Sequence, residues 1–247
     1  MNEPLTTSRW LRETLSIFGA QAGPVLKITG VVYGPVVLLA AAGVAVDLGT
    51  PYAISGWEAW SNLSTVVLLL LNPLATAALV EGVFRHLRGE RISAGRSLRE
   101  MLSRVFAVVG LGIVTVFAVF AGTMLCIVPG IIVQCALIAA PAALIVERAG
   151  VFLAWRRSFD LTDGWRWPIF GIIFLLGLVN AGIGGLLVVS GVWIDDLERM
   201  FMFITIGNLL SAWLLTPVSA IAATLIYHDL RVEKEGIDEE ELVAVFA

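Results

Sequence analysis

Side chains that could carry chemistry are few in this chain of 247 residues, and they form no known catalytic pattern. The sequence has no Gly-x-Ser-x-Gly nucleophile elbow, no His-Glu-x-x-His zinc motif and no phosphate-binding loop. Its two histidines, His86 and His228, each lie near arginines, which suits either a paired metal or proton site or a plain lipid-headgroup boundary. A zinc site needs three or four ligands, and no nearby Cys/His set supplies them. We therefore predict no catalytic residues, no metal and no cofactor.

Two cysteines lie on either side of a Val-Pro-Gly segment at 128–130, which predicts a tight turn. A hairpin there would bring Cys126 and Cys135 within the roughly 4.4–6.8 Å between Cα atoms that a disulfide requires. Two free thiols in lipid-facing or packed positions are the alternative.

Amides lie deep within apolar stretches of the chain, at Asn72, Gln134, Asn180 and Asn208. An amide in hydrocarbon finds a partner, either across a helix interface or in a cavity. Pro73 follows Asn72 and removes a backbone hydrogen bond, so this pair either kinks a packed helix or exposes carbonyls to a ligand.

Acidic residues approach the apolar stretches only near their ends. Glu81 is a candidate coupling carboxylate, although it can also form an ion pair with Arg85 at i, i+4 spacing. With the amides, it completes a set of residues that would line a cavity between helices: Asn72, Pro73, Glu81 and Asn180.

Six apolar stretches carry these residues, and each is near the length of about 20 residues that crosses a bilayer as a helix. The chain is 58% hydrophobic and 15% charged, with a mean hydropathy of +0.90, against about 25% charged in soluble domains. These features predict an all-α polytopic membrane protein. The stretches are Pro24–Val46, Leu63–Phe84, Val105–Val128, Ile131–Val146, Pro168–Trp193 and Phe201–Tyr227.

Charge orients these six spans. Fifteen of the sixteen Lys and Arg residues fall on one side of them, and only Arg199 lies on the other. Because cytoplasmic loops carry the excess of Lys and Arg, both termini are predicted to be cytoplasmic.

A short amphipathic segment precedes each odd-numbered span. Apolar residues at helical spacing opposite a basic face are typical of a helix lying in the headgroup region, or of a helical loop packed on the bundle. The predicted stripes are Leu11, Leu15 and Phe18; Leu98, Met101, Leu102 and Val105; and Phe152, Trp155 and Phe159. The basic rim, as we name the arginines on the second and third segments, is Arg96, Arg99, Arg104, Arg156 and Arg157.

The chain also contains three consecutive segments that resemble one another. Each even-numbered span contains a proline, and spans 2 and 6 end alike, in Phe-Arg-His-Leu-Arg at 84–88 and Tyr-His-Asp-Leu-Arg at 227–231. This predicts three pseudo-repeated hairpins, each after an interfacial helix, over about 5–90, 91–149 and 150–231. One transmembrane domain would span 1–231, followed by an acidic cytoplasmic tail at 232–247.

The ending from Tyr227 to Asp238 resembles the C-terminal signature of a prokaryotic family of membrane domains. These are the membrane domains associated with glycerophosphoryl diester phosphodiesterases, including uncharacterised YciC-like proteins. The basic-Ser-apolar segments and the Val-Pro-Gly turn are similar to its internal pattern. The resemblance implies a six-helix domain in the cytoplasmic membrane of a prokaryote. It implies no phosphodiesterase activity, because the catalytic barrel is absent.

Together these patterns predict a non-catalytic integral membrane protein that binds lipid headgroups, with anionic lipids among the candidates, or a protein partner at the basic rim. The alternative is a transporter or lipid-handling protein with a cavity between the helical repeats. Nothing in the charge distribution indicates nucleic-acid binding.

Overall fold

The computed structural model describes residues 5–47 and 54–236, which form nine α-helices and no β-strand. Six candidate spans within them are long and apolar enough to cross a membrane, which confirms the predicted all-α polytopic fold. The helices are α1 (Thr7–Asp47), α2 (Ile54–Leu87), α3 (Ala94–Ser103), α4 (Val105–Leu125), α5 (Ile127–Leu137), α6 (Ala140–Val146), α7 (Val151–Thr162), α8 (Arg166–Gly191) and α9 (Leu197–Glu235).

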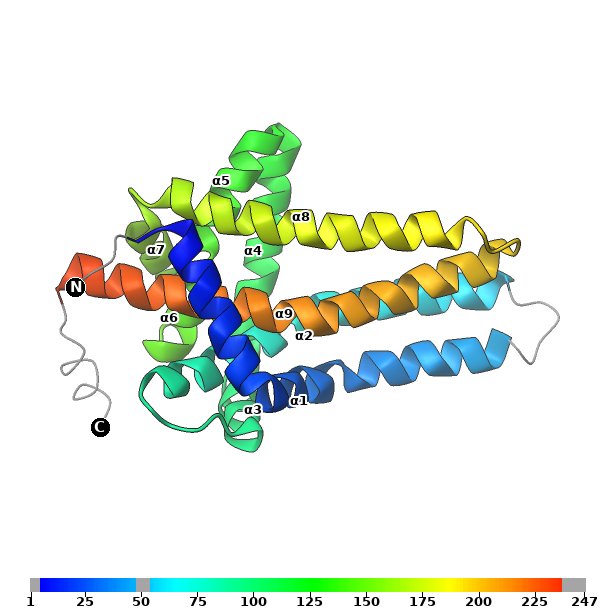
Figure 1. Ribbon diagram of the computed structural model, residues 1–247, viewed down its shortest axis with the longest axis horizontal. Helices are drawn as coiled ribbons and strands as arrows, with labels where there is room; N and C mark the ends of the chain where they lie inside the picture. Colours follow the sequence, from blue (N-terminus) through cyan, green and yellow to red (C-terminus); the bar gives the residue numbers. More distant parts are fainter. Residues whose placement is uncertain (1–4, 48–53, 237–247) are drawn as a thin grey trace.

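Four long helices run together while a hairpin crosses them. In Figure 1, α2, α8, α9 and the second half of α1 lie along the long axis of the molecule, whereas α4 and α5 pair with each other and stand steeply across it. The start of α1 and the end of α9 lie at the same end of the molecule, as the alternating topology predicts. The three hairpins are therefore not equivalent in orientation. The internal repeat, and the side of the membrane that this end faces, stay predictions.

Helix α1 joins the first amphipathic segment to the first span through a kink at Gln21 (φ −121°, ψ 22°). Pro24 lies just beyond this point and has no N–H to bond to the preceding turn, which favours a bend there. The face of the first segment that packs inward carries Trp10 and Thr14, whereas Leu15 is 54% exposed. Phe18 of the predicted stripe packs against the core, so the stripe is divided between the bundle and the outside.

On the other two amphipathic helices, small and large residues share the face that packs against the bundle. Ser97 and Met101 are buried on α3, whereas Leu102 is 62% exposed. On α7 the buried face carries Ala154 and Ser158, and Phe152 of the predicted stripe is 75% exposed. Small side chains such as Ser97 and Ala154 let the helices approach the bundle closely, whereas Leu102 and Phe152 are left on the outside.

The predicted turn at 128–130 is wrong, because α5 begins before it. The chain reverses at Cys126, whose φ and ψ are −173° and 157°, and Pro129 lies within the first turn of α5. A Cβ on Gly122 would lie 3.0 Å from the Cα of Gly130, so α4 and α5 approach closely there. Both cysteines carry free thiols, with Cys126 exposed and Cys135 buried.

The fourth span is broken in the middle. Helix α5 ends at Leu137 and α6 begins at Ala140, with Pro141 as its second residue. Proline is tolerated in the first turn of a helix, because the N–H that it lacks would have no partner there. The two residues between these helices, Ile138 and Ala139, keep φ and ψ in the right-handed helical region, so the interruption is a local loosening of one continuous span.

The last helix is longer than predicted at its C-terminal end. Helix α9 continues to Glu235, past residue 232, where the acidic tail was expected to begin. Residues 237–247 of that predicted tail lie outside the described residues.

Candidate functional site

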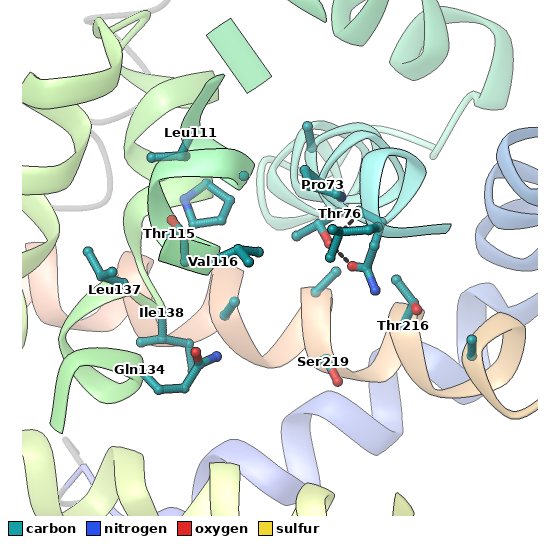
Figure 2. Close-up of a pocket in the computed structure, with 18 of the residues that line it drawn as sticks. Pro73, Thr76, Leu111, Thr115, Val116, Gln134, Leu137, Ile138, Thr216 and Ser219 are labelled. Atoms are coloured by element: carbon teal, nitrogen blue, oxygen red, sulfur yellow. Dashed lines mark hydrogen bonds between the residues drawn. The ribbon is translucent and has the colours of Figure 1, made fainter. Parts of the chain in front are cut away.

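A cavity of about 800 Å³ lies where the α4–α5 hairpin crosses α2, α8 and α9. Its volume is within the range of about 300–1,000 Å³ that is typical of small-molecule sites. Most of its lining is apolar, and no Asp, Glu, Lys, Arg or His occurs among the described residues that line it. Figure 2 shows part of the lining on α2, α4, α5 and α9. The polar side chains of the lining are Asn72, Thr76, Thr115, Gln134, Asn180, Thr216 and Ser219.

On α2, the pair Asn72–Pro73 forms part of this wall. Pro73 has no N–H to donate to the carbonyl of Leu69, one turn earlier. The Thr76 hydroxyl donates to the backbone carbonyl of Asn72 at 3.0 Å and lies 3.5 Å from its side-chain oxygen. The Thr76 hydroxyl is thus already hydrogen-bonded within α2.

Two other amides of the lining have no such partner. Gln134 on α5 and Asn180 on α8 are both exposed, and neither carboxamide makes a hydrogen bond to any residue within 5–47 or 54–236. Leaving an amide without a partner in an apolar medium costs several kcal/mol. These two side chains therefore offer donors and acceptors to a molecule in the cavity.

The break between α5 and α6 forms another part of the wall, through Leu137, Ile138 and Pro141. Just before it, the carbonyl of Ala136 accepts hydrogen bonds from Ser158 Oγ at 2.6 Å and Thr162 Oγ1 at 3.4 Å. Helix α7 thus satisfies part of the backbone near the break.

The cavity brings together three of the four residues named for it from the sequence, Asn72, Pro73 and Asn180. The fourth, Glu81, is not part of the lining. Its Oε1 accepts a hydrogen bond from Arg85 Nε at 2.6 Å on the same helix, which is the ion pair that i, i+4 spacing allowed.

Sequence reasoning missed the hydroxyl groups and the broken helix. Thr76, Thr115, Thr216 and Ser219 line the cavity, yet threonine and serine are too common in membrane helices to stand out. Pro141 was the available signal for the break, because a proline inside a span interrupts its hydrogen bonds.

The arginines of the basic rim do not share one environment. Arg96, Arg99 and Arg156 are exposed, and within the described segments none of them lies within ion-pair distance of a carboxylate. Arg104 Nη1 donates to the carbonyl of Leu144 at 3.4 Å.

Arg157, by contrast, belongs to a network that ties α7 to α9. Its Nε lies 2.9 Å from Glu147 Oε1, and its Nη2 also pairs with Glu235. Tyr227 on α9 donates to the same Glu147 oxygen at 2.7 Å. Burial lowers the pKa of Arg157, but the hydrogen bonds and charges of the two carboxylates outweigh it, so the net pKa is raised. This guanidinium is a cross-link within the protein.

A second network joins the two ends of the chain. Trp10 Nε1 donates to Asp229 Oδ2 at 2.9 Å, and Arg9 lies 3.6 Å from the same oxygen. His228 Nδ1 is 3.3 Å from the other oxygen of Asp229. Among the described residues, no group of three His, Cys, Asp or Glu side chains is arranged to hold a metal ion.

Comparisons of the chain with protein-family models, curated proteins and solved structures give no match. The residues and their geometry are therefore the basis for assigning a function.

Proposed function

We propose that this protein is a non-catalytic integral membrane protein that binds a lipid-like molecule in the cavity between its helices. The observation that carries the proposal is the pair of amides, Gln134 and Asn180, that face an uncharged cavity without a hydrogen-bond partner among the described residues. A bound molecule with hydrogen-bonding groups would satisfy both. Its apolar part would pack on the surrounding Leu, Val and Ala side chains.

Binding fits this lining better than catalysis. The polar groups of the described lining are amides and hydroxyls, which orient a ligand but are poor general acids or bases. A transporter or lipid-handling protein would use the same cavity, whose wall includes the interruption between α5 and α6 at Ile138.

The test is native mass spectrometry of the protein released from native-membrane nanodiscs. We expect the wild type to retain one defined molecule in stoichiometric amount. The double variant Gln134→Leu/Asn180→Leu should lose at least nine-tenths of it while remaining folded. Asn208→Leu is the matched control, because Asn208 is an exposed amide of α9 that does not line the cavity. Equal retention by all three proteins, or bulk lipid alone on the wild type, would refute the proposal.

A second candidate function, binding of anionic lipid headgroups, is favoured by the exposed arginines of the basic rim. Arg96, Arg99 and Arg156 lie on α3 and α7, which also expose the large apolar residues Leu102 and Phe152. Exposed cations beside exposed apolar side chains are typical of a helix at the headgroup level. In this proposal, α3 and α7 lie at the cytoplasmic surface of a prokaryotic membrane.

The rim can be tested by the thermal stabilisation that phosphatidylglycerol gives to the protein in phosphatidylcholine nanodiscs. Each rim arginine contributes roughly 1 kcal/mol toward an anionic surface, so changing Arg96, Arg99 and Arg156 to Gln should remove most of it. Arg199→Gln is the control, because Arg199 lies in the first turn of α9, at the end of this helix opposite Glu235. Full stabilisation of the triple variant would contradict this role.

A further inference from the structure

An apolar groove of about 130 Å³ lies between α2 and α4, next to the cavity. Every described residue that lines it is apolar. Four of them, Leu69, Pro73, Gly112 and Val116, also line the cavity. The groove and the cavity therefore meet where these two helices cross.

The two helices approach each other very closely at this crossing. A Cβ on Gly112 would lie 2.4 Å from Cγ of Pro73, so only a glycine lets α4 lie directly against the proline ring. A molecule that occupies both spaces must therefore pass beside this contact.

The far side of the groove opens onto the surface that faces hydrocarbon. Phe117 is 68% exposed, and Leu69 and Ile113 beside it are exposed as well. Large apolar side chains cover most of the outer face of α4. Whatever occupies the groove therefore comes from the bilayer and not from water.

We infer that a single membrane lipid with an uncharged, hydrogen-bonding head occupies both spaces. Its acyl chain lies in the groove between α2 and α4, and its head reaches Gln134 and Asn180 in the cavity. The inference rests on the proposed function and adds the class of ligand and its route. It makes the α2–α4 crossing a lateral opening to the bilayer.

The head is uncharged because the described lining offers no cation to a phosphate and no anion to an amine. Burying a charge without a partner costs far more than burying a hydroxyl or an ester, which the two carboxamides can satisfy as donors and acceptors. A diacylglycerol is a suitable probe, because its head is a hydroxyl beside two esters.

The position of the chain can be mapped by photo-crosslinking in phosphatidylcholine nanodiscs. The probe is a diacylglycerol with a diazirine at the end of one acyl chain. We expect labelled peptides from α2 and α4 around Leu69 and Phe117, and loss of this label with a tenfold excess of unlabelled diacylglycerol. Leu186 on α8 is an equally exposed apolar control. Equal labelling of α8, or labelling that competition does not reduce, would overturn the inference.

A substitution at the junction tests whether the retained lipid occupies the groove as well as the cavity. Val116→Trp fills the junction and should reduce retained diacylglycerol at least tenfold in native mass spectrometry. Phe120→Trp, at an exposed position one turn further along α4 and outside both linings, should leave retention unchanged. Both positions are exposed, so neither change crowds the core.

Different results would refute the route through the groove and the site in the cavity. If the Gln134→Leu/Asn180→Leu variant loses the ligand while Val116→Trp retains it, the groove is not the route but the cavity is still the site. If the wild type retains phosphatidylglycerol in preference to diacylglycerol, the uncharged head is refuted. If the wild type retains neither lipid and the cross-links are not specific, the proposed function fails as well.

Discussion

Adding one methyl group at the crossing of α2 and α4 tests how closely these helices pack. In Gly112→Ala the new Cβ would lie 2.4 Å from Cγ of Pro73, so the helices must separate by about 1 Å or more to reach an ordinary contact of about 3.5 Å. Both contacting atoms belong to rigid groups, because one is fixed to the α4 backbone and the other to a proline ring. Overpacking of this kind costs about 1–3 kcal/mol.

Gly110→Ala is the matched control on the same helix. Its new Cβ would lie 3.5 Å from Val151 Cγ2, which is an ordinary contact. Each substitution also gains up to about 1 kcal/mol from the higher helix propensity of alanine, and this gain cancels when the two variants are compared. The difference between them is therefore the steric cost alone.

The assay is thermal unfolding of both variants in the same nanodiscs, followed by tryptophan fluorescence. A difference of 1–3 kcal/mol corresponds to a Tm lower by roughly 2–12 °C in Gly112→Ala than in Gly110→Ala. If both variants unfold at the same temperature, the close contact of α4 with Pro73 is wrong. The α2–α4 crossing, beside which the lateral opening is proposed, would then be packed differently.

Three further substitutions test the networks at the opposite end of the bundle. Ser158→Ala removes a buried hydroxyl that donates at 2.6 Å to the carbonyl before the break in the fourth span, and should cost about 1–3 kcal/mol in thermal unfolding. Tyr227→Phe removes the hydrogen bond to Glu147 and should cost about 1–2 kcal/mol, whereas no change in Tm would show that this contact is not formed. Trp10→Phe removes the bond to Asp229 and should increase proteolysis of the first segment of α1, with unchanged cleavage as the contrary result.

Hydropathy and charge predict the spans well because each depends on local composition. The third span was predicted to begin at Val105 and does so, although it ends at Leu125 and not at Val128. The steep crossing of α4 and α5 over the other helices is different, because it depends on which surfaces pack together. The contact of Gly112 with Pro73 joins residues 39 positions apart, and no local pattern reports it.

The candidate site was predictable to the extent that polar residues in apolar stretches are conspicuous. Asn72 and Asn180 stood out for that reason, and both line the cavity. Arg157 shows the limit of such reasoning. Its charge and neighbours suggest a free rim residue, but the carboxylates that pair with it come from positions 147 and 235. Only the folded chain brings them together.

The hydrogen bond between Trp10 and Asp229 has a consequence for how the protein is made, because it joins residues 219 positions apart. At about 5–20 residues per second, roughly 11–44 s pass between the synthesis of one partner and that of the other. Throughout that interval the amphipathic start of α1 has already left the ribosome without its final neighbour. The first segment of α1 is thus among the last of the described helices to reach its place in the bundle.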